Sequence, residues 1–215
     1  MVGMANFIDI HTHHTPIDGQ GVVNFRLGKE SAVPLSPFSA GIHPWDAAPD
    51  YPTLLGRLQE ALAHPHCVAL GEVGLDKACG VNWGVQVDAL TRQLSLAQHR
   101  PIIVHCVRAQ SEMVEILGQH KELQSVIFHG FIGSKEQAGE LTKRGYHLSF
   151  GFGALASPRT IEALRICPEE SLFLETDTST RPIEELYRLV AEIRGIEIKR
   201  LKEIIDNNFN RVFIR

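Results

Sequence analysis

The chain has 215 residues, of which 44% are hydrophobic and 21% charged, a composition typical of a globular protein. Lys and Arg number 21 against 25 Asp and Glu, giving a formal net charge of -4, so no general basic character indicates nucleic-acid binding. No apolar run is long enough to span a bilayer, and the four cysteines are scattered. We therefore expect one domain over 1–215, in a cytoplasmic protein with reduced thiols and no membrane contact.

Short apolar runs alternate with stretches of helical periodicity. The runs are Phe7–Ile10, Phe38–Ile42, Val68–Leu70, Pro101–Val104, Ser125–Phe128, Tyr146–Phe150 and Ser171–Leu174. Such runs are typical of strands buried on both faces in a parallel sheet, and their alternation with helices predicts an α/β fold. One helix is well bounded, since Ser134 and Gln137 resemble a capping box and Gly145 a stop.

Residues 14–40 break this rhythm, because they contain no amphipathic helical stripe. Residues 22–27 alternate instead, with Asn24 and Arg26 on the polar face, which is typical of a strand with one side in water. A parallel crossover needs about a dozen residues and usually a helix. The flanking gaps are barely that long, and Asp18-Gly19 is a turn signal. We therefore predict that strand 22–27 runs antiparallel to its neighbours.

Side chains that bind metal ions follow several of the predicted strands. They are His11 and His13, Glu72 and Asp76, His105, His129, and Glu175 with Asp177. Alternate residues of a strand point the same way, so His11 and His13 project from one face. Because the carboxyl ends of parallel barrel strands build the active site, we expect these side chains to share one pocket.

Four histidines and two carboxylates are too many ligands for one tetrahedral ion and suit a pair. Paired ions about 3.5–4 Å apart clamp the attacking and leaving oxygens of a hydrolytic displacement. The predicted ligands are His11, His13 and Asp177 for the first ion and His105 and His129 for the second, with Glu72 as the bridge. Asp177 is also expected to act as the base toward the attacking water. Taken singly, each residue has a structural alternative, such as an N-cap for Asp177.

Several short motifs occur in one order along the chain. They are Asp9-x-His11-x-His13, Gly41-Ile42-His43-Pro44, Gly71-Glu72-x-Gly74-Leu75-Asp76, Gln93-Leu94-x-Leu96-Ala97, Pro101-x-x-x-His105 with Arg108-Ala109, His129-Gly130-Phe131-x-Gly133-Ser134, Gly145-Tyr146-x-x-Ser149 and Glu175-Thr176-Asp177. In this order they resemble the TatD-type metal-dependent hydrolases of the amidohydrolase-like class. The resemblance implies a TIM-type (β/α) barrel, two divalent ions (Mg, Mn or Zn) and deoxyribonuclease activity, including 3′-to-5′ exonuclease action. Because 14–40 is short for this family, we expect a distorted barrel that lacks its first helices.

Four further residues are candidates for substrate contacts. His43 follows a predicted strand and has the alternatives of binding a phosphate or serving structure alone. Arg108 has the alternatives of a two-pronged phosphate clamp and a helix-surface charge. Asp76 is expected to orient a ligand histidine or touch substrate. Trp45 has the alternatives of stacking on a base and simple packing.

The leading hypothesis is phosphodiester hydrolysis at DNA ends or in short oligonucleotides, because the acidic balance disfavours tight duplex binding. A second is hydrolysis of a small amide, ester or lactone at the same dinuclear site, since fold does not fix substrate. A third is a non-catalytic protein stabilised by metal that binds a partner. The remaining histidines are assigned structural roles: His14, His64, His66, His99, His120 and His147.

Overall fold

The predicted strands form in the computed structural model of the protein, which describes residues 6–15, 20–30 and 32–214. The strands are β1 (Asp9–Thr12), β2 (Gly21–Arg26), β3 (Phe38–Gly41), β4 (Cys67–Asp76), β5 (Ile102–Val107), β6 (Val126–Phe128), β7 (His147–Phe150) and β8 (Leu172–Leu174). Two of them run further than the apolar runs, so that Glu72 and Asp76 lie within β4 and His105 lies within β5. These polar residues were expected just beyond the strands.

Helices follow the later strands in alternation. They are α1 (Leu55–Leu62), α2 (Trp83–Leu94), α3 (Gln110–Gln119), α4 (Lys135–Lys143), α5 (Pro158–Ile166), α6 (Ile183–Arg194) and α7 (Ile198–Phe213), with short 3-10 turns such as η1 (Pro44–Asp46). The capping box at the start of α4 forms as predicted, with the Ser134 hydroxyl accepting from the Gln137 amide and Gln137 returning the bond. None of the described helices combines the length and apolar character needed to cross a membrane.

Close contacts group the chain into two compact units. Unit 1 comprises the described residues up to Val22 and from Phe128 onward, and unit 2 comprises Val23–Ile127. Each unit has its own strands, covering helices and buried apolar side chains. The single domain over 1–215 stays a prediction.

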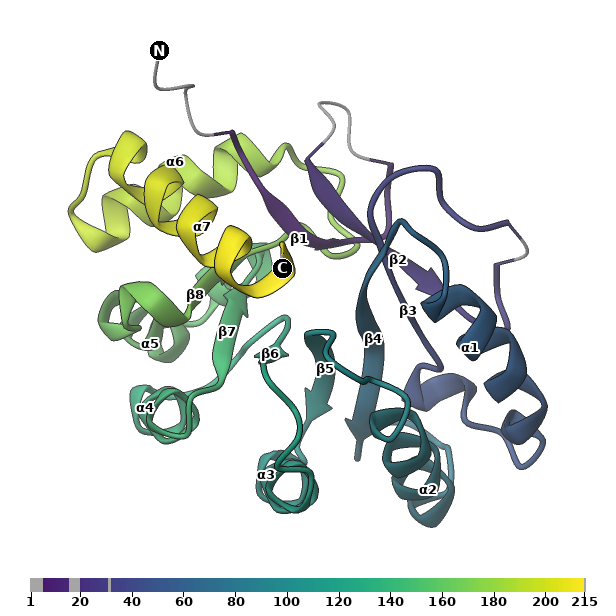
Figure 1. Cartoon of the computed structure of the whole chain (residues 1–215). Coiled ribbons are helices and arrows are strands. Elements are labelled where there is room, and N and C mark those ends of the chain that lie inside the picture. The colour runs from purple at the N-terminus through teal and green to yellow at the C-terminus, as the bar shows by residue number, and fades with distance from the viewer. Residues whose placement is uncertain (1–5, 16–19, 31, 215) are drawn as a thin grey trace. The chain divides into compact units, whose positions relative to one another are not determined.

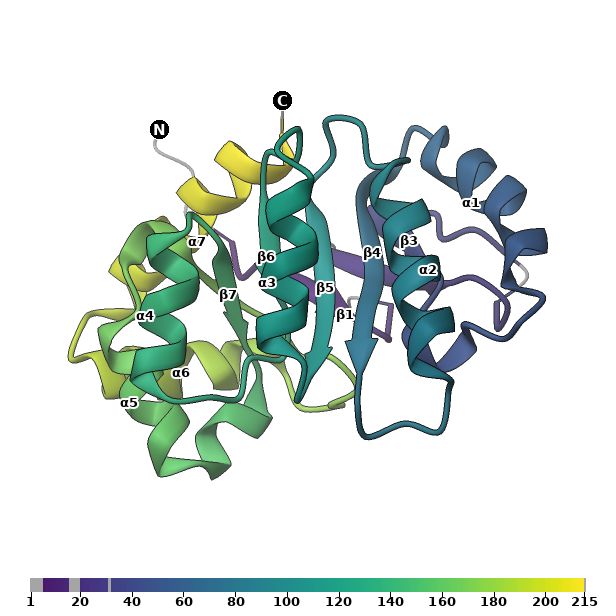
Figure 2. The same ribbon diagram turned by 90° about the horizontal axis from the view of Figure 1, so that it is seen from below.

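Unit 2 contains the parallel strands β2, β3, β4 and β5 in that order. Helix α1 packs on β3 and β4, α2 on β4 and α3 on β5, and Figure 2 shows α2 beside β4 and α3 in front of β5. Strands β4 and β5 approach very closely at Gly74. A Cβ atom there would lie 1.9 Å from the carbonyl oxygen of His105, so glycine is required for this contact. The close approach brings His105 alongside the segment that carries Glu72.

The predicted direction of strand 22–27 is wrong. Strand β2 pairs parallel with β3, with Val23 opposite Phe38 and Arg26 opposite Gly41. The return needs no helix, because the residues from Leu27 to Pro37 reach at most about 35 Å when extended. A strand of six residues such as β2 spans only about 20 Å. The turn expected at Asp18-Gly19 lies outside the described residues.

The missing first helices are confirmed for the described part of the chain, where no residue between β1 and β3 is helical.

The prediction that the polar face of β2 lies in water is wrong. Asn24 was expected to face water, but only 1% of it is exposed. A parallel strand with a polar face therefore contributes a side chain to the interior of unit 2.

Unit 1 contains the parallel pair β7 and β8, and β1 lies beside the end of β8. The chain after β8 continues the pairing, because the amide of Asp177 donates to the carbonyl of His11 and that of His13 to the carbonyl of Asp177. The hydroxyl of Tyr187 in α6 holds the start of β1 through both backbone groups of Ile8. Helices α4 to α7 lie outside β7 and β8 (Figure 1).

Candidate active site

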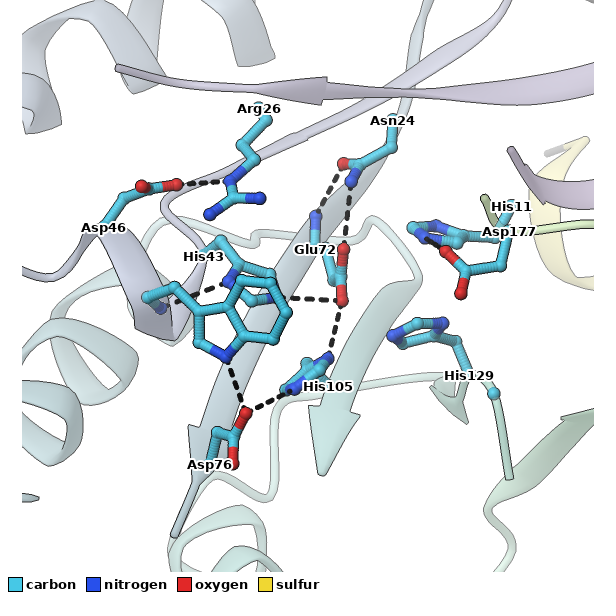
Figure 3. Close-up of polar contacts among 12 residues, drawn as sticks. His11, Asn24, Arg26, His43, Asp46, Glu72, Asp76, His105, His129 and Asp177 are labelled. Carbon is cyan, nitrogen blue, oxygen red and sulfur yellow. Dashed lines mark hydrogen bonds and ion pairs between the residues drawn. The ribbon is translucent and has the colours of Figure 1, made fainter. Parts of the chain in front are cut away.

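Three histidines and an aspartate gather in unit 1. His11 lies within β1, and His13 follows that strand by one residue. Asp177 Oδ1 lies 3.4 Å from His13 Nε2 and 3.8 Å from His11 Nε2. The ring centroid of His129 lies 4.3 Å from that of His11. One donor atom from each of His11, His129 and Asp177 lies within 4.8 Å of the others, and the labelled side chains point toward one another in Figure 3. We call these four residues the unit 1 cluster.

Carboxylates behind the unit 1 cluster hold its members in place. Glu175 is fully buried, and its Oε1 accepts from the Gly130 amide at 2.7 Å and lies 3.1 Å from His129 Nδ1. A contact at Nδ1 orients the ring and directs Nε2 toward a ligand, which is how carboxylates support metal-binding histidines.

Asp9 supports the same cluster from β1. Its carboxylate accepts from the Thr176 hydroxyl at 2.6 Å and from the Thr176 amide at 3.0 Å. Burial raises the pKa of Asp9 to about 7, although the two bonds from Thr176 oppose that rise. Asp9 thus ties β1 to the segment after β8, which carries Asp177.

Unit 2 contains a second group of donors around Glu72, which is buried in β4. Glu72 Oε1 lies 2.7 Å from His105 Nδ1 and 3.1 Å from His43 Nε2. One donor atom from each of these three residues lies within 4.8 Å of the others. Figure 3 shows His43, His105 and Asn24 converging on Glu72. We call Glu72, His43 and His105 the unit 2 cluster.

Asn24 braces Glu72 from β2 and is the residue that sequence reasoning missed. Its Nδ2 donates to Glu72 Oε2 at 3.0 Å, and its Oδ1 accepts from the Glu72 amide at 3.2 Å. The alternation of residues 22–27 had placed Asn24 on a polar face. This alternation would have identified Asn24 as a site residue if β2 had been predicted to run parallel. The inward side chains of a parallel β2 lie level with those of β3 and β4.

Asp76 lies at the end of β4 and contacts two aromatic rings. Its Oδ2 accepts from the Trp45 indole at 2.6 Å and lies 3.3 Å from His105 Nε2. Burial favours the neutral acid, but the bonds from Trp45, the Ala78 amide and His105 outweigh it and lower the pKa of Asp76. Asp76 therefore contacts His105, while its role in orienting a ligand histidine and its contact with substrate stay predictions.

The other predicted substrate residues differ in setting. His43 is buried against Glu72, and burial lowers the pKa of its imidazole despite that carboxylate. Arg108 is exposed directly after β5, in a left-handed conformation with φ of 55°. Its role as a phosphate clamp stays a prediction. The six histidines assigned structural roles belong to neither cluster.

The two clusters fit divalent metal ions by the chemistry of their donors. Each combines imidazole nitrogens with one carboxylate, a set that suits zinc and related divalent ions. Each also has further carboxylates that orient its histidines, which metal sites need. The division of ligands between a first and a second ion, with Glu72 as the bridge, stays a prediction.

The fold resembles solved structures of known hydrolases. The TatD homologue YjjV of Escherichia coli has a TM-score of 0.84 at 24% identity, with 98% of each chain covered. A TatD-family hydrolase of Entamoeba histolytica has a TM-score of 0.74 at 15% identity, covering 91% of this chain and 85% of that one. The protein is therefore an α/β barrel of the TIM type, as predicted.

The sequence comparison specifies the family. The family model described as TatD related DNase matches residues 27–214, and the chain belongs to this family of metal-dependent hydrolases. An uncharacterized metal-dependent hydrolase of Bacillus subtilis, YabD, is 29% identical over 198 residues, covering 80% of this chain and 75% of the relative. The 3′-5′ ssDNA/RNA exonuclease TatD of Cronobacter sakazakii is 27% identical over 201 residues, covering 82% and 76%.

Proposed function

We propose that this protein hydrolyses phosphodiester bonds at the 3′ ends of single-stranded DNA or short oligonucleotides. The observation that carries the proposal is the pair of donor clusters, His11 with His129 and Asp177, and His43 with Glu72 and His105. Two sets of donors in a hydrolase family suit the two-metal chemistry by which phosphodiesters are cleaved. The exonuclease name of the relative from Cronobacter sakazakii supports this choice of substrate.

The metal ligands in this proposal follow the prediction. His11, His13 and Asp177 would hold one ion and His105 and His129 the other, and Glu72 would serve as a shared ligand. Bound Mg, Mn or Zn ions would polarise the phosphate and make a water molecule more acidic. The buried carboxylates of Glu175 and Asp76 orient the rings of His129 and His105, and Asp9 ties the strand of His11 to the segment of Asp177.

Asp177 is proposed as the general base. Its side chain is 39% exposed, so water reaches a carboxylate that also touches His11 and His13. The carboxylate accepts the hydrogen bond from the attacking water and takes its proton as the bond to phosphorus forms. The leaving oxygen is the 3′ oxygen of the preceding nucleotide, so the product is a nucleoside 5′-monophosphate.

Substrate positioning is assigned to His43, Arg108 and Asp76. The Arg108 guanidinium offers donors to phosphate oxygens, and two-pronged contact by arginine adds orientation. Both ring nitrogens of His43 already contact Glu72 and the Trp45 amide, so His43 would act on the substrate through Glu72. The net charge of -4 leaves few cations for a long duplex, which favours single-stranded or short substrates. A cytoplasmic location stays a prediction.

Product analysis on labelled DNA tests the proposal. Purified protein is supplied in turn with Mg, Mn and Zn and incubated with single-stranded DNA labelled at its 5′ end. We expect shortening from the 3′ end with release of nucleoside monophosphates. Asp177→Asn should lower the rate about 10²- to 10⁴-fold, because the proton acceptor is lost. Asp50→Asn, which changes an exposed aspartate, is the matched control.

Two results would contradict the proposal. Hydrolysis of carboxylic esters, amides or lactones with no cleavage of DNA would select the small-molecule alternative at the same site. Bound metal with no turnover of any of these substrates would select a non-catalytic protein stabilised by its ions.

A further inference from the structure

Trp45 is a large apolar side chain with more than half its surface, 53%, in solvent. It lies in η1, directly after β3 and two residues from His43. Tryptophan carries a large apolar ring with one polar N–H, a combination common where one side of the ring meets a ligand or partner. The surrounding contacts hold this ring in a defined orientation while leaving it accessible.

One hydrogen bond fixes the indole of Trp45 and another fixes its backbone. Its Nε1 donates to Asp76 Oδ2 at 2.6 Å, and the Trp45 amide donates to His43 Nδ1 at 3.1 Å. The Arg26 guanidinium carbon lies 5.5 Å from the centre of the indole and is itself paired with Asp46 (Figure 3). A ring fixed in this way loses little conformational freedom when a ligand stacks on it, which favours binding.

The indole also borders the unit 2 cluster. Its ring centroid lies 4.8 Å from that of His43 and 6.0 Å from that of His105, with interplanar angles of 79° and 76°. Neither imidazole therefore stacks flat on the indole. A phosphate attracted by a divalent ion at this cluster would bring the rest of its nucleotide toward the exposed part of Trp45.

We propose that Trp45 is a stacking platform for the base of the nucleotide whose phosphate is held at the unit 2 cluster. The inference rests on the proposed function and names the part of the substrate that the site recognises. A planar base is the occupant that fits, because aromatic stacking accepts every base and requires no hydrogen-bond partners. The neighbouring cation of Arg26 strengthens such binding, since it favours an electron-rich ring and an anionic phosphate.

Fluorescence provides a test that does not depend on turnover. The chain has two tryptophans, so Trp83→Phe leaves Trp45 as the only source of tryptophan emission. In the presence of Mg, adenosine 5′-monophosphate should quench this emission, whereas ribose 5-phosphate, which lacks the base, should not. Equal quenching by the two ligands, or none by the nucleotide, would overturn the inference.

Substitution of Trp45 supplies the second test. Trp45→Leu should weaken adenosine 5′-monophosphate binding about 5- to 150-fold, the range for one stacked base, and change ribose 5-phosphate binding less than twofold. Trp45→Phe keeps an aromatic face and should retain most of the affinity. If Trp45→Leu binds the nucleotide as tightly as the unaltered protein, the inference is wrong.

Cleavage assays separate this inference from the proposed function. Oligonucleotides with a normal or an abasic 3′-terminal nucleotide should be cleaved at different rates by the unaltered protein and at similar rates by Trp45→Leu. Cleavage with no such difference would overturn the stacking platform and leave the phosphodiesterase intact. Base-dependent quenching without cleavage of any oligonucleotide would overturn the phosphodiesterase and support a nucleotide-binding role for Trp45.

Discussion

The carboxylates of the two clusters are held in place by different kinds of partner. In unit 1 the carboxylate of Asp9 accepts from the amide and the hydroxyl of Thr176. The carboxylate of Glu175 accepts from the amide of Gly130. These partners lie within the same short motifs as the ligands. In unit 2 the carboxylate of Glu72 is fixed by side chains from three separate segments of the chain, Asn24, His43 and His105.

This difference predicts which cluster is easier to damage. Every residue except proline has a backbone N–H group, so most substitutions leave the amide donors of unit 1 in place. The support of Asp9 and Glu175 therefore survives most single substitutions in part. The unit 2 network relies on side chains, each of which a single substitution can delete. We therefore expect substitutions around Glu72 to have larger effects than equivalent ones around Asp9.

Glu72→Gln should have the largest effect. The amide keeps the shape of the side chain but loses the charge, and its NH₂ group would face His105 or Asn24, both of which offer N–H groups. We expect activity to fall at least a hundredfold and bound metal to drop, measured by elemental analysis beside the rate assay. Substituting a residue that only supports a ligand lowers metal affinity or activity about 10–100-fold, so a larger loss is expected for a residue that binds the metal itself. Full metal content with full activity would contradict the role of Glu72.

Asn24→Leu should come next, because it removes a brace and not a ligand. Glu72 would lose the donor at Oε2 and its amide would lose its acceptor, both within a buried site. We expect metal affinity to fall about 10–100-fold and the free energy of unfolding to fall by about 1–3 kcal/mol. Metal titration and urea unfolding measure the two effects.

Thr176→Val provides the matched comparison in unit 1. It deletes the hydroxyl that donates to Asp9 Oδ2 but keeps the amide that donates to Oδ1. We expect a smaller loss of metal affinity than for Asn24→Leu. An equal or larger loss would contradict the contrast between side-chain and backbone support.

The same contrast explains what could be predicted from the sequence. Asp9-x-His11-x-His13 and Glu175-Thr176-Asp177 are local, so strand periodicity and order along the chain were enough to mark them. The link between Asn24 and Glu72 spans 48 residues and exists only because β2 runs parallel to β3. Counting residues in the connection gave the wrong direction, because an extended chain covers the return without a helix. The alternation that identified the strand could not show which of its faces meets Glu72.

Substitution of His147 should give the smallest effect, and it compares a partly buried histidine outside the clusters with those of the unit 1 cluster. It begins β7, stacks edge-on against Phe173 and lies near Glu170 and Arg211. Burial, helped by the charge of Arg211, lowers the pKa of His147 to about 4, although Glu170 opposes the shift. Cluster histidines instead lie against carboxylates, as His129 does against Glu175.

The sign of the pH effect follows from which state binds more protons. The pKa of His147 is about 4 in the folded chain against the ordinary histidine value of 6.5 in the unfolded chain, so between these values the unfolded chain takes up the proton more readily. The folded state therefore loses stability as pH falls below 6.5, by about 1–2 kcal/mol at pH 5. His147→Gln cannot take up this proton and should lose less stability between pH 7 and pH 5 in urea unfolding. His99→Gln, which changes an exposed histidine, should lose as much as the unaltered protein. If His147→Gln also loses the full amount, the acid sensitivity originates at other groups.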